Sequence, residues 1–259
     1  MTPNEPLRLE QARAAELGLP GFEVWESLAS TNDRARTLAE CGTRRGWLVV
    51  AQEQSAGRGR RGATWTSIAG EGVWMSMVLG RADAVPQLPI LIGVACAETL
   101  QNVADVDVHV KWPNDLLLDD RKVGGILVER GRGWVVAGVG INVGRAPPHA
   151  EVDGDTPVIR PTSLFEHTSQ RPTLLTLAGE LARHILGLLD AEDRVPRTLE
   201  AFAARDALAR RRVWTEEHGP GMARGLDEDG MLLLELDDGS VRSVRSGRVR
   251  LTPQPGWEE

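Results

Sequence analysis

The sequence predicts an α+β protein in which a larger part of interleaved strands and helices precedes a small all-β barrel. In the first 207 residues, apolar runs of strand length, such as 47–51 and 73–79, mix with helical patterns such as 88–103. After residue 212 only short strand patterns follow, joined by turns rich in aspartate and glycine. We therefore expect one domain over residues 1–207, a barrel over 208–255 and a tail over 256–259.

The elements follow from these patterns in order. We expect strands over residues 22–25, 47–51, 73–79, 107–115, 116–118, 123–129 and 134–143. Helical spacing predicts helices over 9–17, after Asp33, and over 88–103, 173–192 and 198–208. Barrel strands are expected over 213–215, 222–226, 231–236 and 241–244. Residues 144–161 are rich in proline, glycine and aspartate, which predicts a long loop that orders on ligand binding, and the chain after Pro253 is expected to fray.

Composition indicates an ordinary globular protein of the cytoplasm. The chain is 41% hydrophobic and 26% charged, without a signal-peptide pattern or an apolar run long enough for a membrane span. The net charge of −7 argues against a general nucleic-acid binder. Cys41 and Cys96 lack metal-site spacing and are expected to be reduced.

A glycine- and arginine-rich loop lies between two apolar strands. Its core, Gly57-Arg-Gly-Arg-Arg-Gly62, combines a backbone that can wrap a ligand with guanidinium groups suited to phosphate and carboxylate oxygens. The same letters match the dinucleotide-binding fingerprint, but no helix and no acidic residue follow as that fold requires. An anion-binding loop is the favoured interpretation, and a plain solvated loop stays open.

Three other features suggest a ligand site. The only lysines, Lys111 and Lys122, lie in one short segment, which indicates a need for a compact ammonium, with chance clustering as the alternative. The polar run Ser30-Thr-Asn-Asp33 precedes a helical pattern, so its side chains either cap the helix or bind a polar ligand. Glycines inside strands, at 124, 125, 138 and 140, suggest either bulges or a close approach of another group to the backbone.

Four motifs stand in a fixed order along the chain. They are Gly57-Arg-Gly-Arg-Arg-Gly62 followed by Trp65, then Lys111-Trp-Pro-Asn-Asp115, then Arg121-Lys122 with Gly124-Gly125, and finally Gly138-Val-Gly-Ile-Asn142. With a small barrel at the end, this order resembles biotin protein ligase, also called biotin–[acetyl-CoA-carboxylase] ligase. The resemblance spans roughly residues 22–252. It implies a mixed, mainly antiparallel sheet related to class II aminoacyl-tRNA synthetases, followed by an SH3-like barrel.

The resemblance also implies a two-step reaction. Biotin attacks the α-phosphate of ATP to give biotinyl-5′-AMP, and a lysine of a biotin carboxyl carrier protein, a subunit of acetyl-CoA carboxylase, then displaces AMP. Such chemistry needs positioning, charge neutralisation and exclusion of water rather than an enzyme nucleophile. ATP, biotin and Mg²⁺ are the implied ligands, with Mg²⁺ following from ATP chemistry. No metal ligand is assigned to the chain.

Residue roles carry over from the matching motifs. Lys122 would hold the biotin carboxylate, Lys111 would neutralise phosphate charge, and Asp115 would position the incoming amine or hold the metal–phosphate cluster. Arg60 matches the family position whose substitution lets the activated intermediate escape. The implied catalytic residues are Arg60, Lys111, Asp115 and Lys122. The implied biotin-binding residues are Ser30, Thr31, Asn32, Gln54, Gly57, Arg58, Gly59, Arg60, Trp65, Lys122, Gly124, Gly125, Gly138 and Gly140. The implied adenylate-binding residues are Arg58, Arg60, Arg61, Trp65, Lys111, Asn114 and Asn142; Trp65 as plain core is the alternative.

Some features depart from the family. No helix-turn-helix pattern precedes residue 22, so repressor activity is not expected. The 144–161 loop has no aromatic residue to stack on adenine, and Ser55 replaces the family's second glutamine. A lipoate or octanoate ligase on the same fold is one alternative function, and a nucleic-acid-binding regulator is another. The identity of the carrier and a homodimer are left open.

Overall fold

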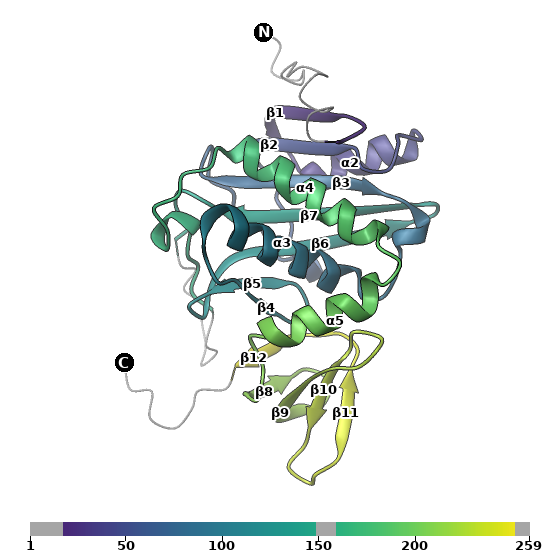
Figure 1. Ribbon diagram of the computed structural model, residues 1–259, viewed down its shortest axis with the longest axis vertical. Helices are drawn as coiled ribbons and strands as arrows, with labels where there is room; N and C mark the ends of the chain where they lie inside the picture. The colour runs from purple at the N-terminus through teal and green to yellow at the C-terminus, as the bar shows by residue number, and fades with distance from the viewer. Residues whose placement is uncertain (1–17, 149–158, 252–259) are drawn as a thin grey trace.

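The computed structural model describes residues 18–148 and 159–251. These residues form a large sheet covered by helices and a smaller sheet beside it (Figure 1). The helix expected over 9–17 and the tail expected to fray lie outside the described residues. Within the described part, no helix combines the length and the apolar composition that crossing a membrane requires.

The large sheet has seven strands in the order β1-β2-β3-β7-β6-β5-β4. Its strands are β1 (Phe22–Leu28), β2 (Leu48–Gln54), β3 (Gly72–Leu79), β4 (His109–Lys111), β5 (Asp115–Leu118), β6 (Arg121–Gly131) and β7 (Trp134–Asn142). Only β1 and β2 pair in parallel, and every other neighbouring pair is antiparallel. The mixed, mainly antiparallel sheet expected from the family resemblance is confirmed.

Helices cover both faces of this sheet. They are α2 (Thr31–Glu40), α3 (Leu88–Ala104), α4 (Leu174–Asp190) and α5 (Arg194–Arg205). Helices α3 and α4 run side by side across one face (Figure 1), whereas α2 packs on β2, β3 and β7 through a separate apolar cluster. Strand β3 is buried at all eight positions because it is covered on both sides.

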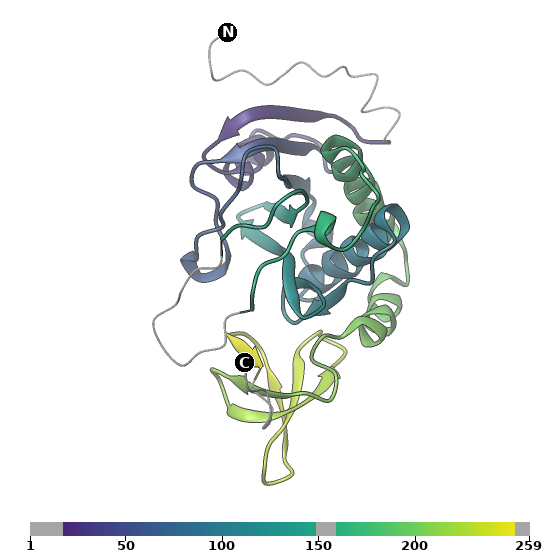
Figure 2. The ribbon, with the colours of Figure 1, turned by 90° about the vertical axis from the view of Figure 1, so that its left-hand side faces the viewer.

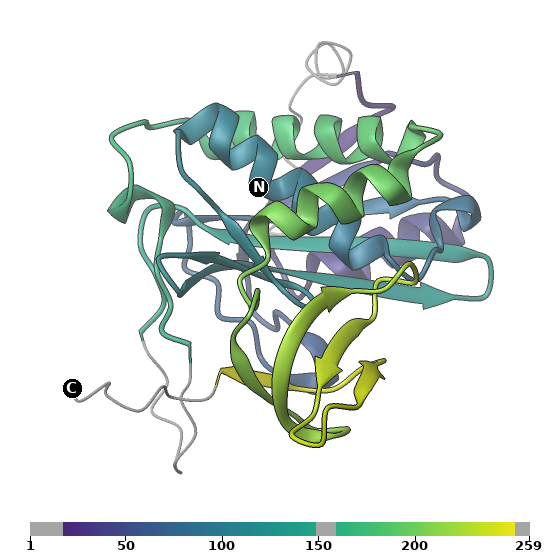
Figure 3. The same ribbon diagram turned by 60° about the horizontal axis from the view of Figure 1, so that its bottom comes forward.

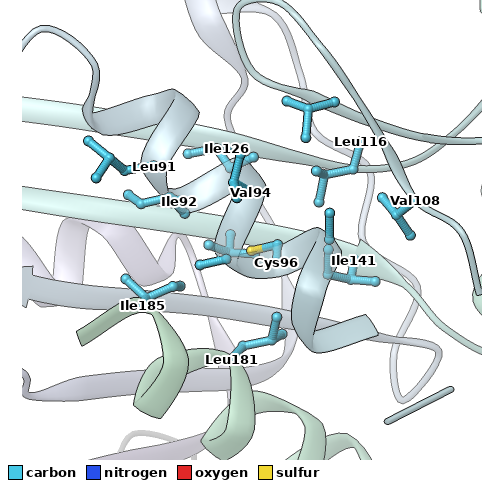
Figure 4. Packing of buried hydrophobic residues seen from close by; sticks show 14 of the residues in the cluster. Leu91, Ile92, Val94, Cys96, Val108, Leu116, Ile126, Ile141, Leu181 and Ile185 are labelled. Carbon is cyan, nitrogen blue, oxygen red and sulfur yellow. The ribbon is translucent and has the colours of Figure 1, made fainter. Parts of the chain in front are cut away.

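The main core lies between the sheet and the helices α3 and α4. Figure 4 shows Ile126 and Ile141 of the sheet beside α3. Ile185 of α4 belongs to the same cluster. Full burial of such a side chain stabilises the fold by about 1.5–3 kcal/mol. The Cys96 thiol of α3 lies in this core, where burial raises its pKa to about 12, so it stays protonated at neutral pH.

The small sheet has five antiparallel strands in the order β11-β10-β9-β8-β12. Its strands are β8 (Arg212–Thr215), β9 (Gly219–Leu226), β10 (Leu232–Glu235), β11 (Val241–Val244) and β12 (Val249–Leu251). Figures 2 and 3 show it beside the β4–β5 side of the large sheet. Side-chain bonds join the parts, among them Trp112 Nε1 donating to Gly230 O (2.9 Å) and Gln87 Nε2 donating to Glu228 O (2.8 Å). A small all-β part is confirmed, and the division at residue 207 stays a prediction.

Three of the differences between the expected and the observed elements have a clear physical reason. The strand expected over 107–115 is split, because after Lys111 the chain turns, with Asn114 N donating to Lys111 O (3.1 Å) around Pro113. Helix α5 begins at Arg194, before Pro196, since proline is tolerated in the first turn of a helix. Strand β12 was not expected, because three residues are too few to show an alternating pattern.

Candidate active site

A cavity of about 550 Å³ lies against the sheet on the side of α2. The start of α2, the β2–β3 loop, strands β4 to β7 and strand β12 all contribute to its wall. In Figure 2 the β2–β3 loop descends toward the small sheet. Its residues 58–61 and 63–65 line the cavity. Predicted site residues on the wall are Ser30, Thr31, Asn32, Gln54, Arg58, Gly59, Arg60, Arg61, Trp65, Lys111, Asn114, Asp115, Lys122, Gly125, Gly138 and Gly140. The structure thus brings together residues that are far apart in the sequence.

A buried hydrogen-bonding network forms one end of the cavity. Gln54 Oε1 accepts from Thr31 N (2.9 Å) and from Thr31 Oγ1 (3.1 Å). Ser76 Oγ donates to Asn32 Oδ1 (2.6 Å), and Asn32 Nδ2 donates to Glu129 Oε2 (2.6 Å). The N-cap Ser30 makes no side-chain cap bond, so the helix-capping interpretation of the polar run fails for its first residue. The amide and hydroxyl groups on this part of the wall can hydrogen-bond a polar, uncharged ligand group.

Strand glycines leave room for two side chains of the site. A Cβ on Gly140 would lie 2.7 Å from the Trp65 indole, and one on Gly138 would lie 2.3 Å from Asn32 Oδ1. Gly125 also faces Trp65, whose ring packs edge-on against Trp74. The glycines are therefore needed because another group approaches the backbone closely, and the bulge interpretation is wrong for Gly138 and Gly140.

Two ammonium groups share one carboxylate at the other end of the cavity. Lys122 Nζ lies 2.5 Å from Asp115 Oδ1, and Lys111 Nζ lies 3.6 Å from Asp115 Oδ2. Burial raises the pKa of Asp115, but the ammonium groups of Lys122 and Lys111 outweigh it, so the pKa is below its ordinary value. Burial lowers the pKa of Lys111, against the opposing effect of Asp115. With one negative and two positive charges, this group has positive charge left for an anion.

The β2–β3 loop folds back on itself above the cavity. Trp65 N donates to Gly57 O (2.9 Å), and Gly59 N donates to Ala63 O (2.6 Å). We call residues 54–67 the lid loop. Its arginines reach three different parts of the protein, so the loop is attached on several sides.

Each lid arginine has its own partner. The Arg58 guanidinium donates to both Asp33 carboxylate oxygens, at 2.7 and 2.9 Å, and lies 3.5 Å from Glu129. Arg60 Nη1 donates to Asn114 Oδ1 (3.3 Å). Arg61, with a left-handed φ of 58°, pairs with Glu216 of the small sheet. The lid loop therefore joins α2, the β4–β5 turn and the small sheet.

Three predicted residues do not line the cavity. Gly57 is buried within the lid loop, where a Cβ would lie 2.5 Å from Trp65 O. Gly124 faces the opposite side of β6 from Gly125, against Ile141 and Gly140 O. Asn142 is buried at the end of β7 and donates to Thr162 O (3.0 Å). These three residues lie outside the cavity wall, and the expectation that they contact the ligand stays a prediction.

Sequence reasoning also missed several residues of the site. Ser76 and Glu129 complete the hydrogen-bonding network, and the only sequence signal was one serine inside the apolar strand β3. Segment 247–251 of the small sheet lines the cavity with Arg248 and Arg250. The return of the long loop also contributes, since Ile159 lines the wall and Thr162 N donates to Lys122 O (2.9 Å). The middle of that loop lies outside the described residues.

The cavity is suited to anions. Among the described residues of its wall, Asp115 is the only carboxylate, while the cations are Arg58, Arg60, Arg61, Lys111, Lys122, Arg248 and Arg250. This concentration of positive charge contrasts with the net charge of −7 for the whole chain. The cavity therefore combines an apolar slot, an uncharged polar end and a strongly cationic mouth, as an enzyme needs when it joins a carboxylic acid to a nucleotide.

Comparison with known proteins agrees with this class. Residues 24–145 match the Biotin/lipoate A/B protein ligase family, and residues 220–251 match the Biotin protein ligase C terminal domain. The biotin--[acetyl-CoA-carboxylase] ligase of Mycobacterium tuberculosis is 30% identical over 245 residues, covering 90% of each chain. The bifunctional ligase/repressor BirA of Bacillus subtilis is 33% identical over 243 residues, covering 86% of this chain and 72% of the relative.

The fold agrees as well. The biotin protein ligase from Aquifex aeolicus in complex with biotin and ATP superposes with a TM-score of 0.78 at 26% identity, covering 90% of this chain and all of the other. Together with the family matches, this likeness identifies the chain as a member of the biotin protein ligase family. The family resemblance and the fold class expected from the motifs are confirmed.

Proposed function

We propose that the protein activates biotin with ATP and transfers the biotinyl group to a lysine of a biotin carboxyl carrier protein. The observation that supports this most is the cavity itself. Its polar uncharged end and its cationic mouth flank an apolar slot beside Trp65, whose ring packs on Gly125 and Gly140. Biotin has the same sequence of parts: a polar ring system, an apolar chain and a carboxylate. The relative from Aquifex aeolicus binds biotin and ATP, which fits this order.

In the first step the residues would position two anions that repel each other. Thr31, Asn32 and Gln54 would bond the ureido group, and Trp65 would pack on the apolar chain. The Lys122 ammonium would hold the biotin carboxylate beside the α-phosphate, where Lys111 and Arg60 would neutralise charge. The carboxylate oxygen attacks phosphorus, a mixed anhydride forms, and pyrophosphate leaves.

In the second step the lid loop would exclude water while the acceptor amine approaches. A neutral amine from the carrier attacks the anhydride carbonyl, the carbon–oxygen bond to AMP breaks, and the amine proton is lost. Asp115 would orient this amine, because it is the only carboxylate on the described wall of the cavity. Arg58 and Arg61 would bind the adenylate phosphate or ribose from the lid side.

Mg²⁺ enters this scheme as part of the Mg–ATP substrate. Among the described residues, no group of three histidine, cysteine, aspartate or glutamate side chains is arranged to hold a metal ion. Asp115, the single carboxylate on the described wall, already pairs with two ammonium groups. The phosphates and water would therefore supply most of the Mg²⁺ ligands. The cytoplasmic location, the absence of a nucleic-acid partner and the acetyl-CoA carboxylase subunit as carrier belong to the same proposal, and a homodimer stays open.

The lipoate alternative is not favoured. The relatives from Mycobacterium tuberculosis and Paracoccus denitrificans are named as biotin--[acetyl-CoA-carboxylase] ligases. The network of Thr31, Asn32 and Gln54 also offers hydrogen bonds that a lipoyl or octanoyl chain would leave unmade. Comparing ATP–pyrophosphate exchange with biotin, lipoate and octanoate tests this choice. A nucleic-acid regulator is also not favoured, and binding of a labelled duplex at low salt would be its test.

Replacing Lys122 with alanine tests the proposed function. We expect biotin-dependent ATP–pyrophosphate exchange to fall by at least about 100-fold, since a charge that positions the reacting carboxylate is lost. Lys122→Arg keeps the charge but not the compact head, and should retain part of the activity. Circular dichroism confirms folding, and mass spectrometry of a carrier domain after incubation with the wild type measures transfer. Near-normal exchange by Lys122→Ala would refute the assigned role.

A further inference from the structure

The amino groups of this protein are distributed in an unusual way. In all 259 residues the only lysines are Lys111 and Lys122, and both lie on the cavity wall. The other basic residues at the cavity are arginines, with Arg58, Arg60 and Arg61 on the lid loop and Arg248 and Arg250 on the small sheet. We call these five residues the arginine rim. The mouth of the cavity is therefore cationic, yet its rim has no amine.

This distribution matters because the intermediate of the proposed reaction is an acylating agent. An acyl phosphate transfers its acyl group to a neutral amine, whereas a guanidinium is delocalised, stays protonated in proteins and does not act as an acceptor. A lysine on the rim would meet the intermediate intramolecularly, at an effective concentration of about millimolar or above. Lysine in place of the rim arginines would thus compete directly with the carrier.

The two internal lysines need a different protection. Lys122 Nζ is 2.5 Å from Asp115 and 5.4 Å from the Trp65 ring centre, so its head group is held between the carboxylate and the ring. Lys111 also faces Asp115 and is buried, so it has little freedom to move toward a carbonyl carbon. Both amines are held by the Asp115 carboxylate, so neither is free to swing toward the carbonyl carbon as an acceptor.

We propose that the arginine rim, together with the two lysines paired with Asp115, prevents the enzyme from acylating itself and so reserves the activated biotin for the amine of another protein. This inference rests on the proposed function. The avoided side reaction is amide formation, in which a lysine nitrogen bonds to the biotinyl carbonyl carbon, the bond to AMP breaks and a proton is released. It needs no co-reactant beyond biotin and ATP.

The test is to place an amine on the rim. Arg248→Lys is the main variant, because Arg248 is exposed and lines the cavity from the small sheet. Arg61→Lys places an amine on the lid side of the same rim. Arg183→Lys is the matched control, since Arg183 is exposed on α4, which covers the opposite face of the sheet from α2. Each protein is incubated with biotin and Mg–ATP without a carrier and measured by intact mass and peptide mapping.

We expect the wild type and Arg183→Lys to gain no biotin, and the rim variants to gain biotin at the new lysine, at least about tenfold above the control. Biotin-dependent pyrophosphate exchange is measured in every protein to show that the intermediate forms. Biotin found on any amine of the wild type would overturn the inference. So would unlabelled rim variants that retain exchange. Absence of exchange in the wild type would instead refute the proposed function, and the inference with it.

Discussion

The indole of Trp65 occupies the space left by the missing side chains of Gly125 and Gly140. A Cβ on Gly140 would lie 2.7 Å from this ring, closer than real carbon contacts allow. The ring in turn contacts Trp74 and lies under the Lys122 ammonium. A single hydrogen atom in place of a methyl group thus sets the width of the slot.

Gly140→Ala tests this dependence. The added methyl must displace Trp65, which costs about 1–3 kcal/mol for overpacking, so we expect biotin to bind roughly tenfold more weakly or worse. Isothermal titration calorimetry measures the affinity. Gly187→Ala in α4 is the control, because a Cβ there meets nothing within 4 Å. Equal affinities in the two variants would contradict the assigned slot.

We expect Lys111 to set the upper pH limit of the activity. Burial lowers its pKa below the ordinary 10.5, so the ammonium loses its proton, and its charge, at a lower pH than a free lysine does. Because the unfolded chain holds that proton more tightly, this group adds to folding stability as pH rises through the same window. We expect pyrophosphate exchange to fall with an apparent pKa below 10.5 while circular dichroism stays constant. Exchange that stays flat to pH 10.5 would count against the role of Lys111.

The first turn of α2 is the element that joins the two ends of the site. Thr31 and Asn32 belong to the hydrogen-bonding network, and Asp33, the next residue, pairs with Arg58 of the lid loop. The guanidinium of Arg58 donates hydrogen bonds that lower the pKa of Asp33, so this pair is ionised at neutral pH. One helical turn therefore connects the ring-binding end with the loop above the reaction centre.

Asp33→Asn tests the connection. The variant loses the negative charge that holds Arg58. Because the ion pair is partly exposed, it is worth about 1 kcal/mol at most. We therefore expect the intermediate to escape roughly three- to fivefold faster. Release of radiolabelled adenylate from a preformed complex measures this rate. Arg36→Ala is the control, since it removes the other ion pair of Asp33, at 2.9 Å, without touching the lid. Identical release rates in both variants would contradict the connection between α2 and the lid loop.

On the scale of the whole molecule, the small sheet completes the cavity formed by the large one. Segment 247–251 supplies wall residues, and Glu216 pairs with Arg61 of the lid loop. The two parts stay together through buried contacts, including the bond from Trp112 to Gly230. The small sheet therefore belongs to the site as well as to the fold.

Trp112→Phe tests this joint. Removing the indole N–H leaves the Gly230 carbonyl without its donor, which we expect to lower the free energy of unfolding by about 1–2 kcal/mol and to raise KM for ATP. Urea unfolding and exchange kinetics measure the two effects. In Trp25→Phe the lost bond, to Glu23, lies within β1, so KM should stay unchanged. A rise in KM in both variants would argue against the joint.

Much of this protein was determined by local sequence. Apolar periodicity predicted most of the strands and the helices α3 and α4, because the side-chain period of an element is a property of its own residues. The order of the glycine, arginine and lysine motifs predicted the family, and the arginine content of residues 57–62 indicated an anion-binding loop.

The tertiary structure alone decided which of those residues meet. Alternation along β6 sends the neighbours Gly124 and Gly125 to opposite faces, but only the pairing of β6 with β7 decides that Gly125 is the one that faces Trp65. Packing placed Asn142 behind Thr162, brought Ser76 and Glu129 to Asn32, and set Arg248 beside the lid loop. These contacts depend on strand pairing and on the docking of the small sheet. Both are set by many residues that are distant in the sequence, so no single position shows which partner it will meet.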